Sequence, residues 1–170
     1  IGEGHPEPCD LVVVHCTPTV DRPPDAAEHA DRVAQLRRSI EQLGEFGRTI
    51  GVRYAFENLP GYHALGWDVA ELAGLLADIA APNTGLCFDS GHANLVGDAV
   101  SAVGRTAGQM IYLHLADHSD DADDHEMFTR GRVEHDRFAA AVREAGYRHT
   151  MMLEVFRPVE RLEQMMDEGL

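Results

Sequence analysis

The chain has 170 residues and can therefore bury one substantial hydrophobic core, which predicts a single domain over residues 1–170. Its 29 acidic residues outnumber its 14 basic residues, and the formal net charge of −15 makes nucleic acid an unlikely partner because phosphate backbones bind cationic surfaces. All 14 basic residues are arginine, so Schiff-base catalysis and a P-loop lysine are excluded for this sequence.

Strand and helix patterns alternate from the start of the chain. Residues 10–16 are a nearly continuous, β-branched apolar run, which predicts a strand buried on both faces of a parallel sheet. Asp25 and Glu28 have the spacing of a capping box, and the apolar residues after them recur at helical spacing, so we predict an amphipathic helix over about residues 26–47. A second strand is predicted over residues 50–57.

The same strand-then-helix unit recurs in the middle of the chain. Asp68 and Glu71 repeat the capping-box spacing ahead of a second apolar helix, which Pro82 ends. A third strand is predicted over residues 84–89, and a short helix is predicted to start near residues 97–98.

Two further units complete the pattern. Strands are predicted over residues 110–115 and 149–155, with a helix of about ten residues between them that Gly146 closes. Pro158 suits the first turn of a last helix, which would carry Leu162. Consecutive strand-then-helix units favour an α/β fold with a parallel sheet, and in such folds functional residues gather at the carboxyl ends of the strands.

Each predicted strand carries a ligand-type residue at or near its carboxyl end. Taken alone, each has an ordinary explanation: the first could be a hydrogen-bonded structural histidine, and the two glutamates could pair with Arg53 and Arg157. Because parallel strands end at the same edge of a sheet, we expect all of these side chains to converge. In chain order they are His15, Glu57, Asp89, His114 and Glu154.

Carboxylates that converge at a buried edge need a compensating charge, which a divalent cation provides. No cysteine falls at these strand ends, so we do not expect a thiolate ligand. A set of two glutamates, one aspartate and one histidine suits one Mn²⁺, Mg²⁺, Co²⁺ or Zn²⁺ ion with a position open for a substrate oxygen. Glu57 and Glu154 could then act as general base and general acid.

The cysteines and the apolar segments indicate where the protein works. Cys9, Cys16 and Cys87 are odd in number and form no CxxC pair, which fits reduced thiols and predicts a cytoplasmic location. No signal peptide or apolar stretch long enough for a membrane span is visible, so no membrane association is expected. Since the chain opens with Ile1 rather than Met, a trimmed terminus and a missing N-terminal portion are both open.

Five short segments together resemble the xylose isomerase-like (β/α)₈ TIM barrel superfamily, which includes sugar isomerases and epimerases and the endonuclease IV enzymes. The resemblance extends over about residues 10–157 and implies the C-terminal part of such a barrel, with about five βα units present. The segments are Glu57-Asn58, Asp89-Ser-Gly-His92, Tyr112-Leu-His114-Leu-Ala-Asp117, the Asp123-Asp-His125 to Gly131 loop, and Leu153-Glu154-Val155.

The resemblance implies a metal-dependent isomerase or epimerase acting on a sugar, a sugar derivative or a polyol. Glu57, Asp89, His114 and Glu154 would bind the metal, and the two glutamates would move a proton through an enediolate. His92 would contact a substrate oxygen, and we expect His15 and Asn58 to line the substrate.

The sequence also departs from the family pattern. The first three of eight barrel strands are not visible, so the chain is a fragment or the remaining strands come from outside this sequence. Exposed strand edges predict poor solubility or association with another chain, such as a homo-oligomer. Thr129 replaces a glycine that the family often has, and Asp120 stands where some epimerases have an arginine.

Two other functions remain open. In endonuclease IV-like enzymes an Asp-x-His pair binds additional zinc, so Asp123 and His125, with His15 and His92, keep a multi-zinc phosphodiesterase as an alternative. A barrel fragment that binds metal without turnover is the other. The acidic run that contains Asp120 is expected to be a solvated loop.

Overall fold

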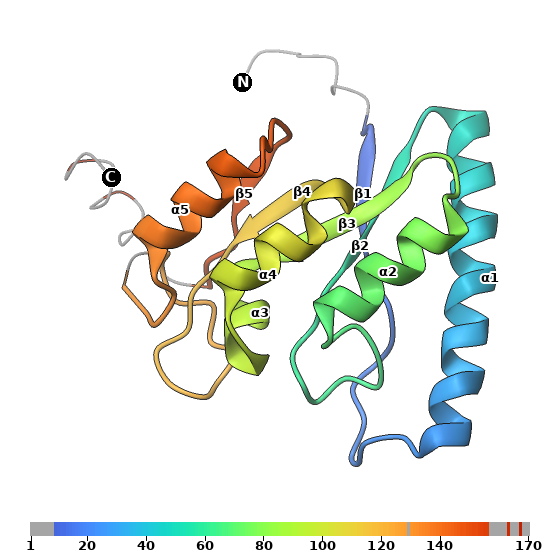
Figure 1. The fold of residues 1–170 in the computed structure, drawn as a ribbon, viewed down its shortest axis with the longest axis horizontal. Coiled ribbons are helices and arrows are strands. Elements are labelled where there is room, and N and C mark those ends of the chain that lie inside the picture. Colours follow the sequence, from blue (N-terminus) through green and yellow to red (C-terminus); the bar gives the residue numbers. More distant parts are fainter. Residues whose placement is uncertain (1–8, 129, 157–162, 164–166, 168–170) are drawn as a thin grey trace.

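The structure is a computed structural model that describes residues 9–128, 130–156, 163 and 167. Five parallel strands form one sheet in sequence order. Figure 1 shows the helices lying along one face of this curved sheet, as in the wall of a barrel. The predicted α/β barrel architecture is therefore confirmed for five strands, and the helix predicted from Pro158 lies outside the described residues. The strands are β1 (Leu11–His15), β2 (Arg53–Glu57), β3 (Thr84–Asp89), β4 (Met110–Leu115) and β5 (Met151–Leu153).

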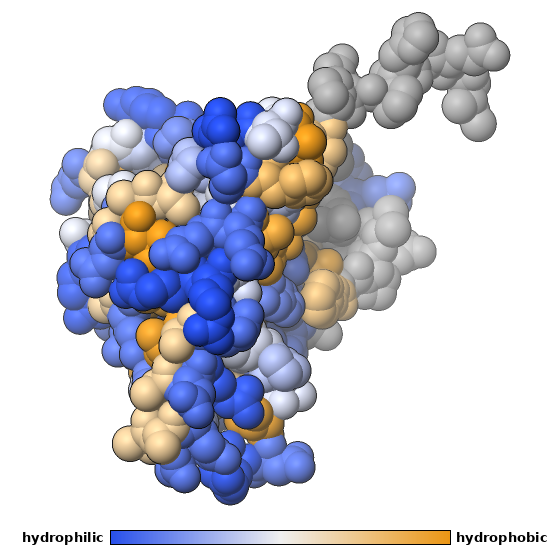
Figure 2. Space-filling model, turned by 90° about the vertical axis from the view of Figure 1, so that its right-hand side faces the viewer, coloured by the Kyte–Doolittle hydropathy of each residue, from blue (hydrophilic) through white to orange (hydrophobic). Residues whose placement is uncertain are grey.

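The first helix, α1 (Ala26–Ile50), begins with the predicted capping box. The Asp25 carboxylate accepts the Glu28 N–H at 2.9 Å, and the Glu28 carboxylate accepts the Asp25 N–H at 3.0 Å. Gly47 does not end the helix but lies inside it, where it packs closely against Val52 of the following segment. The residue that ends the helix is Gly51, which has a left-handed conformation with φ of 74°. Figure 2 shows that the face on the α1 side is largely hydrophilic, with small apolar areas between polar side chains.

The second helix, α2 (Val69–Ile79), has only half of the capping box predicted for it. Asp68 accepts the backbone N–H of Ala70 and of Glu71 at 3.0 and 3.1 Å, as an N-cap residue should. The Glu71 side chain instead meets His29 Nε2 of α1 at 2.9 Å. A contact between neighbouring helices has therefore replaced the local one.

Three helices follow the third and fourth strands, and one of them was not predicted. That helix, α3 (Ser90–Val96), starts directly after β3 because the Asp89 carboxylate accepts the His92 N–H at 2.7 Å and caps it. The helix predicted near residues 97–98 is α4 (Ala99–Thr106), followed by one 3₁₀ turn, Ala107–Gln109. The last, α5 (His135–Glu144), is followed by Gly146 in a left-handed conformation, as predicted.

The hydrophobic core lies between the helices and the middle of the sheet, and the outer strands are more exposed. Phe56, Leu86 and Phe88 are all at most 1% exposed. By contrast, Val12 of β1 is 39% exposed, so the expectation that this strand is buried on both faces is wrong; β1 is an edge strand in the described sheet. The other edge strand, β5, spans Met151–Leu153 rather than residues 149–155 and is exposed along its length. Among the residues that the structure describes, no helix has the length and apolar character needed to cross a membrane.

Replacing Gly47 by alanine is expected to destabilise the protein by about 1–3 kcal/mol, because the new Cβ would lie 2.3 Å from the Val52 carbonyl oxygen. Gly74 in α2 is the matched control. No atom of the described residues lies within 4 Å of the position that a Cβ would take there, so Gly74→Ala should stabilise the helix by about 0.5–1 kcal/mol. Urea unfolding of both variants measures this difference, and equal stabilities would contradict the close packing at Gly47.

Candidate metal centre and active site

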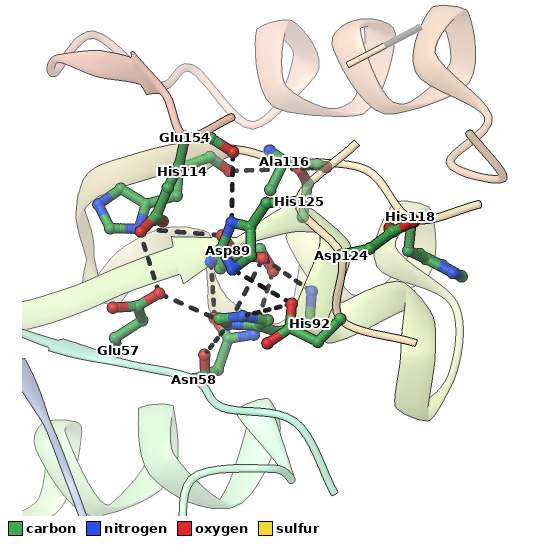
Figure 3. Close-up of polar contacts among 12 residues, drawn as sticks. Glu57, Asn58, Asp89, His92, His114, Ala116, His118, Asp124, His125 and Glu154 are labelled. Atoms are coloured by element: carbon green, nitrogen blue, oxygen red, sulfur yellow. Dashed lines mark hydrogen bonds and ion pairs between the residues drawn. The ribbon is translucent and has the colours of Figure 1, made fainter. Parts of the chain in front are cut away.

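The predicted ligand residues lie at one edge of the sheet because four parallel strands end there. Glu57 and Asp89 are the last residues of β2 and β3, His114 lies one residue before the end of β4, and Glu154 follows β5 directly. The strand register places Asp89 beside His114 and His15 beside Glu57. Figure 3 shows four of these side chains, without His15, pointing toward a common region.

The centre of the cluster is the Nδ1 atom of His114, which faces three carboxylates. It lies 3.1 Å from Glu57 Oε1, 3.8 Å from Asp89 Oδ2 and 2.5 Å from Glu154 Oε2. One possible ligand atom from each of these four residues lies within 4.8 Å of all the others. This is an O,O,O,N set of the kind that binds a divalent cation.

Several buried atoms of the cluster have no hydrogen-bond partner among the described residues. They are Asp89 Oδ2, His114 Nε2 and Glu154 Oε2; the short approach of this last oxygen to His114 Nδ1 does not have hydrogen-bond geometry. Buried polar atoms are normally paired, and an unpaired carboxylate oxygen inside a protein is costly. The residues present therefore fit a divalent metal ion, whose charge would compensate three carboxylates at once.

The electrostatics of the metal-free cluster point the same way. Burial raises the pKa of Asp89 to about 6. Burial also acts to raise the pKa of Glu57, but hydrogen bonds with His114 and His15 outweigh it and lower this pKa to about 2. Burial acts to lower the pKa of His114, but its contacts with the Cys87 thiol and the two glutamates raise it. In the metal-free protein a proton on His114 thus supplies positive charge that a divalent cation would replace.

The structural alternatives for the two glutamates can be compared directly. Arg53 binds Asp10 Oδ2 at 2.9 Å, so it does not neutralise Glu57. Glu57 Oε2 instead lies 3.3 Å from Nε2 of His15, whose pKa the hydrogen bond with Glu57 raises. Arg157, the alternative partner of Glu154, lies outside the described residues.

A second group of possible ligands adjoins the first. Asp123 Oδ1 lies 3.2 Å from both His92 Nε2 and His125 Nε2, and the three residues have mutually close ligand atoms. Tyr62, in the loop after β2, donates its hydroxyl to Asp123 Oδ2 at 2.8 Å. The structure therefore brings together Asp123 and His125, which were predicted as an additional metal pair, and His92, which the multi-zinc alternative also named; His15 contacts Glu57 instead.

Asn58 and His92 connect the two groups. His92 Nδ1 donates to the Asn58 carbonyl oxygen at 2.9 Å, and His92 Nε2 lies 3.2 Å from Asp123 Oδ1, so both ring nitrogens face acceptors. The Asn58 side chain bonds the backbone of Asp89 with both its atoms, at 2.7 and 3.1 Å, and is fully buried. Asn58 was predicted to line the substrate. In the structure its side-chain amide connects the end of β2 to the end of β3.

The sequence reasoning missed three residues near the site. The expectation that no cysteine lies near the ligands is wrong, because Cys87 Sγ lies within 4.8 Å of ligand atoms of Glu57 and His114. Ser90 donates its hydroxyl to the Ala116 carbonyl oxygen at 2.6 Å and joins α3 to the segment after β4. His63 is also buried, with Nδ1 unpaired. For Cys87 a signal existed, since residues two apart in a strand share a face.

Several known proteins are similar to this chain in sequence or in structure. A relative from Methanocaldococcus jannaschii, an uncharacterized protein, is 25% identical over 120 residues, which are 68% of this chain and 41% of the relative. The crystal structure of a D-tagatose 3-epimerase-like protein matches with a TM-score of 0.77 and 22% identity, covering 94% of this chain and 61% of that one. D-allulose 3-epimerase from Methylomonas sp., in complex with D-allulose, matches with a TM-score of 0.66 and 20% identity, covering 82% and 46%.

These likenesses to solved structures establish the fold, and the chain spans less than two thirds of each of these relatives: 41%, 61% and 46% of their lengths. The family model described as the xylose isomerase-like TIM barrel matches residues 7–170, nearly the whole sequence. The resemblance inferred from the five segments is thereby confirmed. The chain belongs to the xylose isomerase-like TIM barrel family.

Proposed function

We propose that this chain carries the metal-binding and proton-transferring part of a sugar epimerase or isomerase that depends on one divalent metal ion. The observation that carries the proposal is the position of His114 Nδ1, within 4 Å of three carboxylates from three other strand ends. Two structural relatives named as a sugar 3-epimerase or as similar to one support the substrate class, a small sugar or polyol.

In this proposal the four residues divide into two roles. All four residues would hold the metal, and Glu57 and Glu154 would in addition exchange a proton with the substrate. The ion, of the Mn²⁺, Mg²⁺, Co²⁺ or Zn²⁺ type, would polarise the substrate carbonyl. The acidity of the adjacent C–H bond rises when the carbonyl is polarised, so a carboxylate can remove its proton to give an enediolate.

The side chains differ in access to a substrate. The Glu154 side chain is 23% exposed and that of Glu57 only 2%. Glu154 therefore lies nearer the solvent-facing side of the cluster. Glu57 is buried and contacts the imidazoles of His15, His92 and His114. His15, whose side chain is 62% exposed, would donate a hydrogen bond to a substrate oxygen; both ring nitrogens of His92 face protein acceptors, so His92 would contact the substrate only if Nε2 left Asp123.

Deuterium exchange tests the proposal on the whole 170-residue chain. After loading with Mn²⁺ or Co²⁺, the protein is incubated in deuterated water with D-tagatose, D-allulose, D-fructose and L-ribulose, and the sugars are followed by proton NMR. We expect one bound ion per chain and deuterium at the carbon next to the carbonyl group. A protein that binds one ion but exchanges none of these sugars would instead be a metal-binding barrel segment without turnover.

A second candidate function rests on the group formed by His92, Asp123 and His125. Additional zinc ions bound there would favour an endonuclease IV-like phosphodiesterase. Three zinc ions per chain by elemental analysis, together with cleavage of DNA at abasic sites, would support this alternative over the epimerase. The net charge of −15 speaks against a DNA substrate unless bound metals offset it.

A further inference from the structure

Cys87 lies on the same face of the sheet as the proposed metal ligands. Leu86 and Phe88 pack into the hydrophobic core on the helix side, so the side chains of Cys87 and Asp89 project from the opposite face. The register pairs Cys87 directly with Glu57 on β2. Cys87 is fully buried, and one residue pair separates it from the level of Asp89 and His114.

Three different ligand types meet around this thiol. Cys87 Sγ, a carboxylate oxygen of Glu57 and a ring nitrogen of His114 all lie within 4.8 Å of one another, and all three residues are buried. His114 is only 3% exposed, and its Nε2 has no hydrogen-bond partner in the part of the chain that the structure describes. The thiol is thus one member of a sulfur, oxygen and nitrogen set with unused coordinating capacity.

We propose that Cys87, Glu57 and His114 form a second, deeper site for a soft divalent cation such as Cd²⁺. Thiolate sulfur prefers soft ions, whereas the three carboxylates and one imidazole of the first set suit Mn²⁺ or Mg²⁺. When the soft ion binds, the S–H bond of Cys87 breaks, a sulfur–metal bond forms, and the proton passes to the solvent. No oxidant or reductant is needed.

The two sites share Glu57 and His114, so ions at the two sites would compete for these side chains. A soft ion at the deeper site would withdraw both groups from Asp89 and Glu154. Cys87 would therefore make the protein discriminate among metals, with soft ions displacing the hard ion that the first set holds. This inference requires metal binding at the cluster but not the epimerase reaction.

Cys16 provides a matched control. Its Sγ lies 3.5 Å from the backbone carbonyl oxygen of Glu57, so it is a second thiol next to the same residue. It belongs to none of the ligand groups found among the described residues. Removing this thiol should leave a soft-metal site unchanged.

Ultraviolet spectroscopy with added Cd²⁺ tests the inference on the full chain. We expect a thiolate-to-metal charge-transfer band in the wild type and in Cys16→Ser, and no band in Cys87→Ser or in Cys87→Ala. By calorimetry, Cys87→Ser should bind Cd²⁺ about tenfold or more weakly, while its affinity for Mn²⁺ changes by less than about twofold. Circular dichroism identifies a variant that fails to fold. Because Cys87 is replaced by both serine and alanine, the test can still be made if one of the two variants does not fold.

Three results would overturn the inference: a band that persists without Cys87, Cd²⁺ bound to the wild type without a sulfur band, or no binding of Cd²⁺ to the wild type. Failure of the sugar exchange alone would contradict only the proposed function. The charge-transfer band is measured without substrate and so tests Cys87 separately.

Discussion

The variant Glu154→Gln is expected to lose sugar proton exchange by about 10²–10⁴-fold, the range that general acid–base catalysis contributes. Glutamine keeps the size of the side chain, but its neutral amide cannot take a proton from the substrate carbon. Glu154 is the most exposed of the four clustered side chains, so its replacement disturbs the packing least. Metal content and deuterium incorporation into a ketose measure the result. Metal retained with exchange lost would assign Glu154 to proton transfer.

Glu57→Gln should lose exchange to a similar degree but for more than one reason. Glu57 contacts His114, His15 and His92 at 3.1, 3.3 and 3.5 Å, so a neutral amide also weakens three imidazole contacts. We therefore expect lower metal affinity as well as lost exchange. Glu45→Gln is the control, because this exposed residue of α1 pairs with Arg48 on the helix surface, and it should leave exchange unchanged. Exchange within a few-fold of wild type in Glu154→Gln would refute its role.

The order of strands and helices and the convergence of the ligands could be predicted from sequence for physical reasons. A buried parallel strand needs an apolar run, and a helix start needs a cap such as Asp25, so each element has a local signal. Parallel strands end at one edge, so residues as far apart as Glu57 and Glu154 must converge once the strands are recognised. In the structure, ligand atoms of Glu57 and Glu154 lie within 4.8 Å of each other.

The features that were missed depend on contacts between distant residues. The seven residues of α3 show no helical period of their own, and Asp89 both caps this helix and belongs to the metal cluster. The half-formed capping box at α2 follows from the contact between Glu71 and His29, 42 residues earlier. The exposure of Val12 and Met151 depends on their strands forming the edges of the described sheet, which an apolar pattern does not reveal.

Asp89→Asn is expected to have opposite effects on the metal-free and the metal-bound protein. Asp89 is fully buried, and no described residue hydrogen-bonds its Oδ2. Two further carboxylates lie around His114, the imidazole that Asp89 faces. Asparagine removes one of these like charges and adds an N–H group that can donate a hydrogen bond to a glutamate. Its carbonyl oxygen can still accept the His92 N–H that Asp89 caps. Without metal, the variant should therefore be more stable by about 1–3 kcal/mol.

In the presence of metal, the wild type should be more stable than the variant, because the variant has lost a charged ligand. Its affinity for Mn²⁺ should fall by at least about 10- to 100-fold, the loss that follows even from removing a group that merely supports a ligand. Thermal unfolding in EDTA and in excess Mn²⁺, with calorimetry, measures both effects. Asp98→Asn is the control, since exposed Asp98 caps α4 and asparagine caps equally well. A variant that is less stable in EDTA, or that binds Mn²⁺ like the wild type, would mean that the carboxylates at these strand ends are arranged for something other than a metal ion.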